Sequence, residues 1–178
     1  MAVGDITLST NTLKLTLSAT LQKELDGRNA SDPVNENRTV KLATGTGTEK
    51  GNQEFADYRA LSTGASESLD LYGGLTNTFG VTINFNTIRQ FYVENTSTAS
   101  TLIIDGTVAN AWVGFLDSAG TITLQPSGAN YPSFIALSAP AATGMDVTAA
   151  TGDVLKFTHG GEDSANLTYR IVIVGEQA

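Results

Sequence analysis

His159, the single histidine, and the carboxylates around it are the first residues whose types could carry chemistry. His159 and Asp153 would offer an imidazole and a carboxylate to a metal ion, but the ligands of a metal site must converge on one ion. Two glycines follow His159, which predicts an exposed hairpin loop before the last strand. A serine hydrolase would also need a partner serine, and the chain has no G-x-S-x-G sequence. We therefore expect neither a metal site nor a catalytic triad here.

The glycine-rich run Thr44–Gly51, TGTGTEKG, invites comparison with a phosphate-binding loop. Lys50 stands where G-x-G-x-x-G requires its third glycine, and the G-K-[ST] of a P-loop is absent. No helix pattern follows that would present a positive N-terminus to a phosphate. We interpret the run as a flexible loop.

Four carboxylates, Glu54, Asp57, Glu67 and Asp70, lie close together in the sequence. A glycoside hydrolase needs two carboxyl groups about 5–10 Å apart in a cleft, and the sequence leaves that alternative open. Calcium is a second alternative, although no D-x-[DN]-x-[DN]-G run is present. The spacing favours a solvated edge or turn, so we predict no catalytic residues, no metal and no cofactor.

The composition restricts the partners that the protein can take. The chain has 178 residues and no cysteine, which excludes disulfides, thiolate metal sites and a cysteine nucleophile. Its net charge of −8 repels phosphate, so we expect binding neither to nucleic acid nor to a membrane surface. Charged residues make up 16% of the chain, whereas about 25% is usual. A surface so poor in charge loses little on desolvation, which favours a protein that works in contact with others.

From Arg38 to the C-terminus the pattern is that of β structure. Short stretches of alternating apolar and polar residues recur about every 8–15 residues, separated by turn sequences such as Asp105-Gly106. We predict an all-β body over residues 38–178, an antiparallel β-sandwich or jelly roll. The last strand, Thr168–Val174, is apolar enough to lie inside a sheet. The aromatic residues are spread one or two per strand, as a sandwich core requires.

Residues 1–37 are different, and we predict an extended N-terminal arm. Alternation over Thr12–Ser18 indicates an extended segment, whereas leucines spaced by four, followed by Gly27, indicate a short helix over Ala19–Asp26. The polar stretch from Gly27 to Asn37 is typical of a linker. With too little apolar content to fold alone, the arm is expected to dock on a neighbouring subunit. Its predicted contacts are Ile6, Leu8, Leu13, Leu15, Leu17, Leu21 and Leu25.

Three stretches of the body carry a resemblance to a known family. They are Leu69-Asp70-Leu71-x-Gly73-Gly74-Leu75-Thr76-x-x-Phe79-Gly80-x-Thr82-Ile83-x-Phe85-x-x-Ile88-Arg89, Thr151-Gly152-Asp153-x-Leu155-x-Phe157 and Tyr169-x-Ile171-x-Ile173-x-Gly175. Together, from about Thr48 to Gly175, they resemble small β-rich virion structural proteins of tailed bacteriophages, most of all capsid decoration (cement) proteins. The resemblance implies a structural role with a sandwich or jelly-roll body, and it brings no catalytic residues with it.

We therefore expect a structural protein, not an enzyme, that binds the outside of a phage capsid and stabilises it. Its expected partners are the major capsid protein and copies of itself, as a homo-oligomer with a trimer favoured. It would be made in the host cytoplasm and reside on the capsid surface. The alternative is a tail, neck or fibre component that binds a receptor or carbohydrate, for which an exposed aromatic cluster near Trp112 or Tyr131 would argue.

Overall fold

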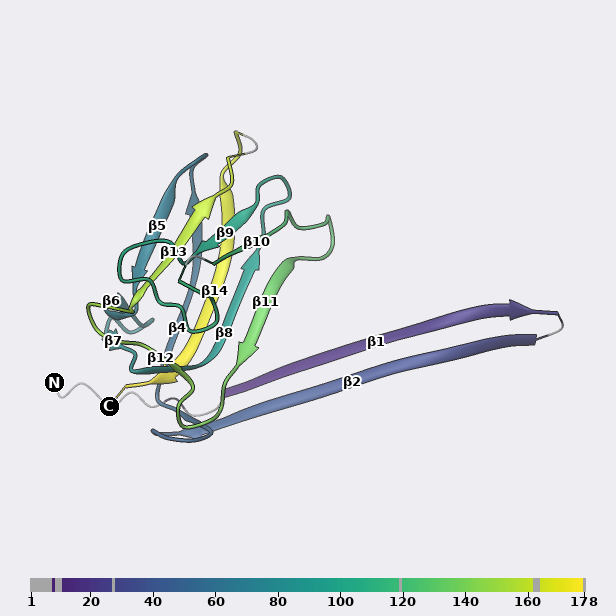
Figure 1. Ribbon diagram of the computed structural model, residues 1–178, viewed down its shortest axis with the longest axis horizontal. Coiled ribbons are helices and arrows are strands. Elements are labelled where there is room, and N and C mark those ends of the chain that lie inside the picture. The colour runs from purple at the N-terminus through teal and green to yellow at the C-terminus, as the bar shows by residue number, and fades with distance from the viewer. Residues whose placement is uncertain (1–7, 9–10, 27, 119, 162–163, 178) are drawn as a thin grey trace.

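The computed structural model describes residues 8, 11–26, 28–118, 120–161 and 164–177 (Figure 1). These residues form fourteen strands and no helix, so the all-β prediction is confirmed. It follows that the described residues include no helix long and apolar enough to cross a membrane.

Two antiparallel sheets make up most of the body. The first has the order β11-β8-β14-β4, with β12 on β8: β4 (Gln53–Leu61), β8 (Thr87–Asn95), β11 (Ser133–Ser138), β12 (Met145–Asp146) and β14 (Leu167–Glu176). The second has the order β10-β9-β13-β5: β5 (Ser66–Asp70), β9 (Leu102–Asp105), β10 (Thr121–Leu124) and β13 (Val154–His159). Beside them, β6 (Tyr72–Thr76) pairs with β7 (Thr82–Asn84).

One hydrophobic core fills the space between the two sheets, since every second residue of their strands points inward. The rings of Phe157 on β13 and Tyr169 on β14 lie 4.8 Å apart across that space. Trp112 is also buried, and its indole nitrogen donates a hydrogen bond of 2.9 Å to the carbonyl of Asp146. The last strand, β14, lies between β8 and β4, as its apolar sequence predicted.

The N-terminal segment is a long β-hairpin that projects away from the body (Figure 1). Its strands are β1 (Asn11–Leu25) and β2 (Arg28–Thr44), paired antiparallel from Asn11 with Leu42 to Leu25 with Arg28. A two-residue strand, β3 (Lys50–Gly51), then runs parallel to the end of β2. The boundary expected between residues 37 and 38 falls inside β2.

Two predictions for this segment are wrong. Residues Ala19–Leu25 continue β1 instead of forming a helix, because a spacing of four places leucines on one face of a strand as well as of a helix. The stretch predicted as a linker is the first part of β2. Its asparagines and Pro33 are tolerated there because β2 has only one neighbour over this length.

A buried ion pair fixes the base of the hairpin to the body. Arg89 on β8 is fully buried, and its Nη2 lies 2.6 Å from the Glu176 carboxylate at the end of β14. The same guanidinium donates to the carbonyls of Ala141 and Ala142, in the loop after β11. The second oxygen of Glu176 accepts a hydrogen bond of 2.5 Å from the Gly47 amide, in the turn that follows the hairpin.

Replacement of Arg89 by methionine should therefore strongly destabilise the protein. The substitution would leave the largely buried Glu176 carboxylate without its counter-ion and the carbonyls of Ala141 and Ala142 without their donor. Breaking a buried ion pair in this way typically costs about 3–5 kcal/mol. Urea unfolding followed by fluorescence of the buried Trp112 measures the loss, with Arg38→Met, an exposed arginine of the hairpin, as the matched control. A loss below about 1 kcal/mol, equal to that of the control, would contradict this assignment.

Candidate assembly surface

The two faces of the hairpin differ, because only one of them carries a row of leucines. Residues directly opposite each other in an antiparallel pair share a face. One face, here called the leucine face, carries Leu13, Leu15, Leu17, Ala19 and Leu21 of β1, with Val40 opposite Leu13 and Val34 opposite Ala19. The residues of β2 opposite Leu15, Leu17 and Leu21 are charged: Arg38, Glu36 and Asp32. The other face carries threonine, serine, lysine and asparagine, with cross-strand hydrogen bonds from Thr16 to Asn37 (3.0 Å) and from Ser18 to Asn35 (2.8 Å).

The leucine face is covered only at its root. Leu13 and Val40 are half-buried, whereas Leu15, Leu17 and Leu21 are 49%, 57% and 75% exposed. Complete burial of a leucine contributes about 1.5–3 kcal/mol, so these three side chains could contribute a further ~3–5 kcal/mol if covered. A two-stranded hairpin without such cover is marginally stable in water. The outer part of the leucine face is therefore an exposed row of large apolar side chains on a two-stranded ribbon.

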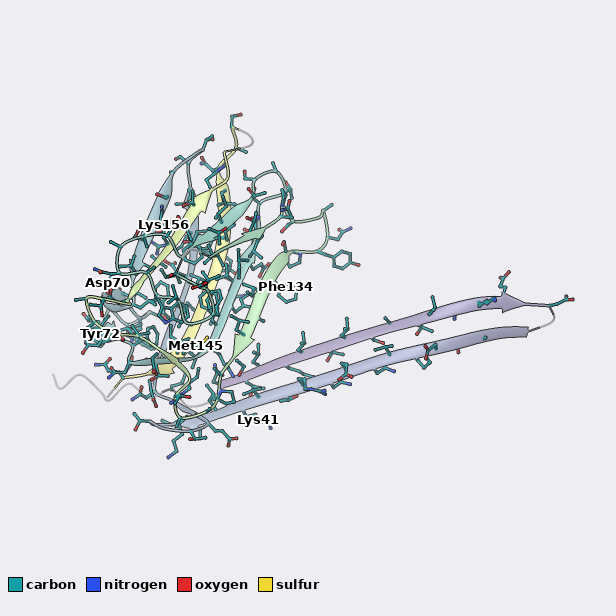
Figure 2. All side chains as sticks on the ribbon, in the orientation of Figure 1. Lys41, Asp70, Tyr72, Phe134, Met145 and Lys156 are labelled. Carbon is teal, nitrogen blue, oxygen red and sulfur yellow. The ribbon has the colours of Figure 1, made fainter. Side chains whose placement is uncertain are left out.

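At the root, the leucine face and the outer face of the first sheet enclose a groove of about 450 Å³. Leu13, Leu15 and Val40 line one wall, and Tyr92 and Phe134 line the other. Figure 2 labels Phe134 on β11, on the side of the body from which the hairpin departs. The Tyr92 and Phe134 rings lie 5.9 Å apart. Burial, with a hydrogen bond of 2.7 Å to Glu94, raises the pKa of Tyr92 to about 12.

A second, smaller hollow of about 180 Å³ separates the start of β1 from the same sheet. The Asn11 Oδ1 and Gln90 Nε2 atoms in its wall are buried without hydrogen-bond partners among the described residues, as is the nearby Ser138 hydroxyl. The root therefore meets the sheet partly through polar groups rather than through close apolar packing alone.

The structure brings together most of the predicted contact residues. Leu13, Leu15, Leu17 and Leu21 share the leucine face, and the register places Leu25 in the same row at the end of β1. Leu8 lies outside β1, half-buried, and its carbonyl accepts a hydrogen bond from the Thr44 hydroxyl. Ile6 lies outside the described residues. The sequence reasoning missed Val34 and Val40, although their even spacing to Leu42 is a period-two signal.

No protein-family model matches this chain, and no curated protein does. The interpretation of the site therefore depends on its geometry.

His159 holds a loop in place. It is 2% exposed at the end of β13, where its Nδ1 accepts a hydrogen bond of 2.8 Å from the Gly161 amide. Its Nε2 lies 2.9 Å from the carbonyl of Ala165, so both ring nitrogens are engaged with the backbone. Within the described residues no group of three or more histidine, cysteine or carboxylate side chains is placed to hold a metal ion.

Two of the four clustered carboxylates meet at one arginine. Arg59 lies 2.7 Å from Asp57 and 2.6 Å from Glu67, beside a groove of about 590 Å³ that Asp70 also lines. The hydrogen bond that Arg59 donates to Glu67 raises the pKa of Arg59 above its ordinary value, although partial burial acts in the opposite direction. The guanidinium thus occupies the space between the two carboxylates, where a glycosidase would place its substrate.

The other candidates for binding chemistry are structural or isolated. The amides of Gly45 and Gly47 donate to the Gly51 carbonyl and the Glu176 carboxylate, so they are not free to bind a phosphate. Trp112 is 2% exposed and packs against Phe91 and Phe115, so it offers no exposed ring to the tail or fibre alternative. Tyr131 is 80% exposed in the loop before β11.

The buried tyrosines predict a loss of stability in alkali. Burial and a hydrogen bond of 2.7 Å to Glu67 raise the pKa of Tyr169, as burial raises that of Tyr92 from 10.0 to about 12. Between pH 10 and 12 the unfolded chain has lost these protons while the folded chain keeps them. The free energy of unfolding is therefore unaffected below pH 10 and falls as the pH rises through this range.

The free energy of unfolding of the variant Tyr92→Phe/Tyr169→Phe should fall less steeply than that of the wild type between pH 10 and 12. Between pH 7 and 9 it should depend on pH as it does in the wild type. Denaturant unfolding at each pH provides the measurement, and tyrosinate absorbance shows when the phenols titrate. The variant Tyr58→Phe/Tyr131→Phe, which changes two exposed tyrosines, is the control. Equal slopes for both variants above pH 10 would contradict the prediction.

Proposed function

We propose that this protein is a structural component of a phage virion, a decoration (cement) protein that binds the outside of a capsid and stabilises it. The observation that carries the proposal is the exposed leucine face of the hairpin, which presents apolar side chains on a ribbon extending from the body. A surface of this kind supports a role in assembly, because covering it on another subunit stabilises both the hairpin and the contact.

We further propose that the body is a jelly roll, a fold used by many capsid proteins. Its strand orders β11-β8-β14-β4 and β10-β9-β13-β5 support this. The chain passes from one of these sheets to the other between β4 and β5, β8 and β9, β10 and β11, and β13 and β14. It also crosses between β5 and β8, through β6 and β7, and between β12 and β13. Such crossings arise when one long antiparallel ribbon is wrapped into two four-stranded sheets.

The low charge density supports the same role, because few ions must be desolvated at each contact. A symmetric oligomer, for which we propose a trimer, would bind a capsid at several points at once. Weak contacts then combine, since each bound subunit raises the effective concentration of the next. The lattice gains buried surface across the boundaries between capsid subunits.

Charges placed on the leucine face should weaken the association with capsids. We expect Leu17→Asp/Leu21→Asp to weaken co-sedimentation with undecorated capsids at least tenfold. Thr20→Asp/Gln22→Asp, which places the same charge on the polar face of the same hairpin, should change it by less than twofold.

The wild-type protein should sediment with the capsids in a fixed ratio to the shell protein, and light scattering of the free protein gives its oligomeric state. A wild-type protein that does not co-sediment with capsids would overturn the proposal. Saturable glycan binding that depends on Tyr131 would instead favour the tail or fibre alternative, because that ring is exposed as a sugar platform requires.

A further inference from the structure

The outer face of the first sheet is a second apolar surface. The strand register places Tyr58, Arg170, Glu94 and Phe134 in one row across β4, β14, β8 and β11. The next row holds Ala56, Val172, Tyr92 and Ala136. These two rows are here called the sheet face. Tyr58 is 72% exposed, Phe134 is 49% exposed and Ala56 is exposed, so part of the sheet face is open to solvent.

The two charges of the sheet face already have partners within it. The Arg170 guanidinium lies 5.3 Å from the centre of the Tyr58 ring, and the Tyr92 hydroxyl donates to Glu94. Covering the sheet face therefore leaves neither of its own two charges without a partner, and an unpartnered ion is the main cost of burying charged groups. The outer half of the hairpin brings two further charges, Asp32 and Glu36, of which Glu36 pairs with Arg38 at 2.8 Å. A surface of aromatic rings and small aliphatic side chains suits the row of leucines laid across it.

The chain itself contains such a contact. Leu13 and Leu15 of its own leucine face line the groove with Tyr92 and Phe134, and Leu13 lines the smaller hollow with Val172. Beyond Leu15 the hairpin leaves the body, so its outer half has no sheet beneath it (Figure 1). Each copy therefore has an outer hairpin that packs on no sheet, and a sheet face that the root of its own hairpin covers only in part.

We propose that the outer half of one hairpin, Leu17–Leu21 with Val34, packs on the sheet face of a second copy, beside that copy's own hairpin root. The contact would continue the interface that the root already makes within one chain. This inference depends on the proposed role of the hairpin in assembly and identifies its partner surface as the sheet face. It is a contact between two different surfaces of the chain, so it gives a reciprocal dimer when two copies exchange hairpins and a ring when the rotation between copies closes.

The available area is that of a small interface. At about 3.3 Å per residue and about 10 Å across two strands, the segment Leu17–Leu21 and the strand opposite it cover a footprint of roughly 165 Å². A reciprocal dimer makes this contact twice and a ring makes it once per interface. The interface therefore lies below the range of about 1,200–2,000 Å² that is typical of stable interfaces, in the range of weak and transient ones.

Cross-linking between two different copies tests this pairing directly, since the chain has no cysteine of its own. Copies carrying Leu21→Cys are mixed with copies carrying Tyr58→Cys and treated with a short bifunctional maleimide. We expect a cross-linked heterodimer at least tenfold more abundant than with Phe79→Cys, an equally exposed aromatic position in the β6–β7 turn. Cross-linking of Leu21→Cys copies to each other alone would overturn the proposal in favour of hairpin-to-hairpin packing.

Complementation provides a second test that does not depend on cross-linker geometry. We expect Leu17→Asp/Leu21→Asp and Ala56→Asp/Tyr58→Asp each to be monomeric by light scattering. A mixture of the two should form dimers, because the intact hairpin of one fits the intact sheet face of the other. Thr20→Asp/Gln22→Asp and Phe79→Asp should assemble as the wild type does.

The two proposals fail in different ways. A monomeric wild-type protein at 100 µM, or a mixture that stays monomeric, would overturn the pairing proposed here. If the heterodimer is cross-linked and the mixed variants form dimers, but the protein does not co-sediment with capsids, only the decoration role is overturned.

Discussion

The buried ion pair between Arg89 and Glu176 is the interaction on which the rest of the structure depends. It joins β8, the end of β14, the loop after β11 and the turn that follows the hairpin, which are distant in the sequence. A charge at this depth is tolerable because the guanidinium is paired and also donates to backbone carbonyls. The hairpin can therefore project from the body and still be firmly attached at its base.

The body and the hairpin differ in how far their apolar side chains are buried. The body closes two sheets over one core, in which Leu102, Ile104 and Phe157 are fully buried. The hairpin has two strands and no layer above it, so its leucines stay exposed within a single chain. This contrast is the physical basis for assigning assembly to the hairpin. In the pairing that we propose, the partly open outer face of the first sheet on another copy would supply the layer that the hairpin lacks.

Groups that suggested chemistry are used within the fold. His159 holds the loop before β14 through both ring nitrogens, and Arg59 separates Asp57 from Glu67. The glycine-rich turn gives its amides to a carbonyl and to Glu176. In each case residues of the types found in active sites are joined to one another or to the backbone, which stabilises loops and edges. The outer leucines of the hairpin, by contrast, remain exposed, as does part of the sheet face.

The sequence by itself determined the all-β class, the interior position of the last strand and the even spacing of the arm leucines, because these depend on local alternation and turn chemistry. It did not separate strand from helix over Ala19–Leu25, since a spacing of four satisfies both periods. Only the tertiary structure decided that the polar stretch before Arg38 pairs with β1, which joins Val34 and Val40 to the leucines. It also buried Trp112 and aligned Tyr58 with Phe134, because such contacts depend on pairing between distant strands.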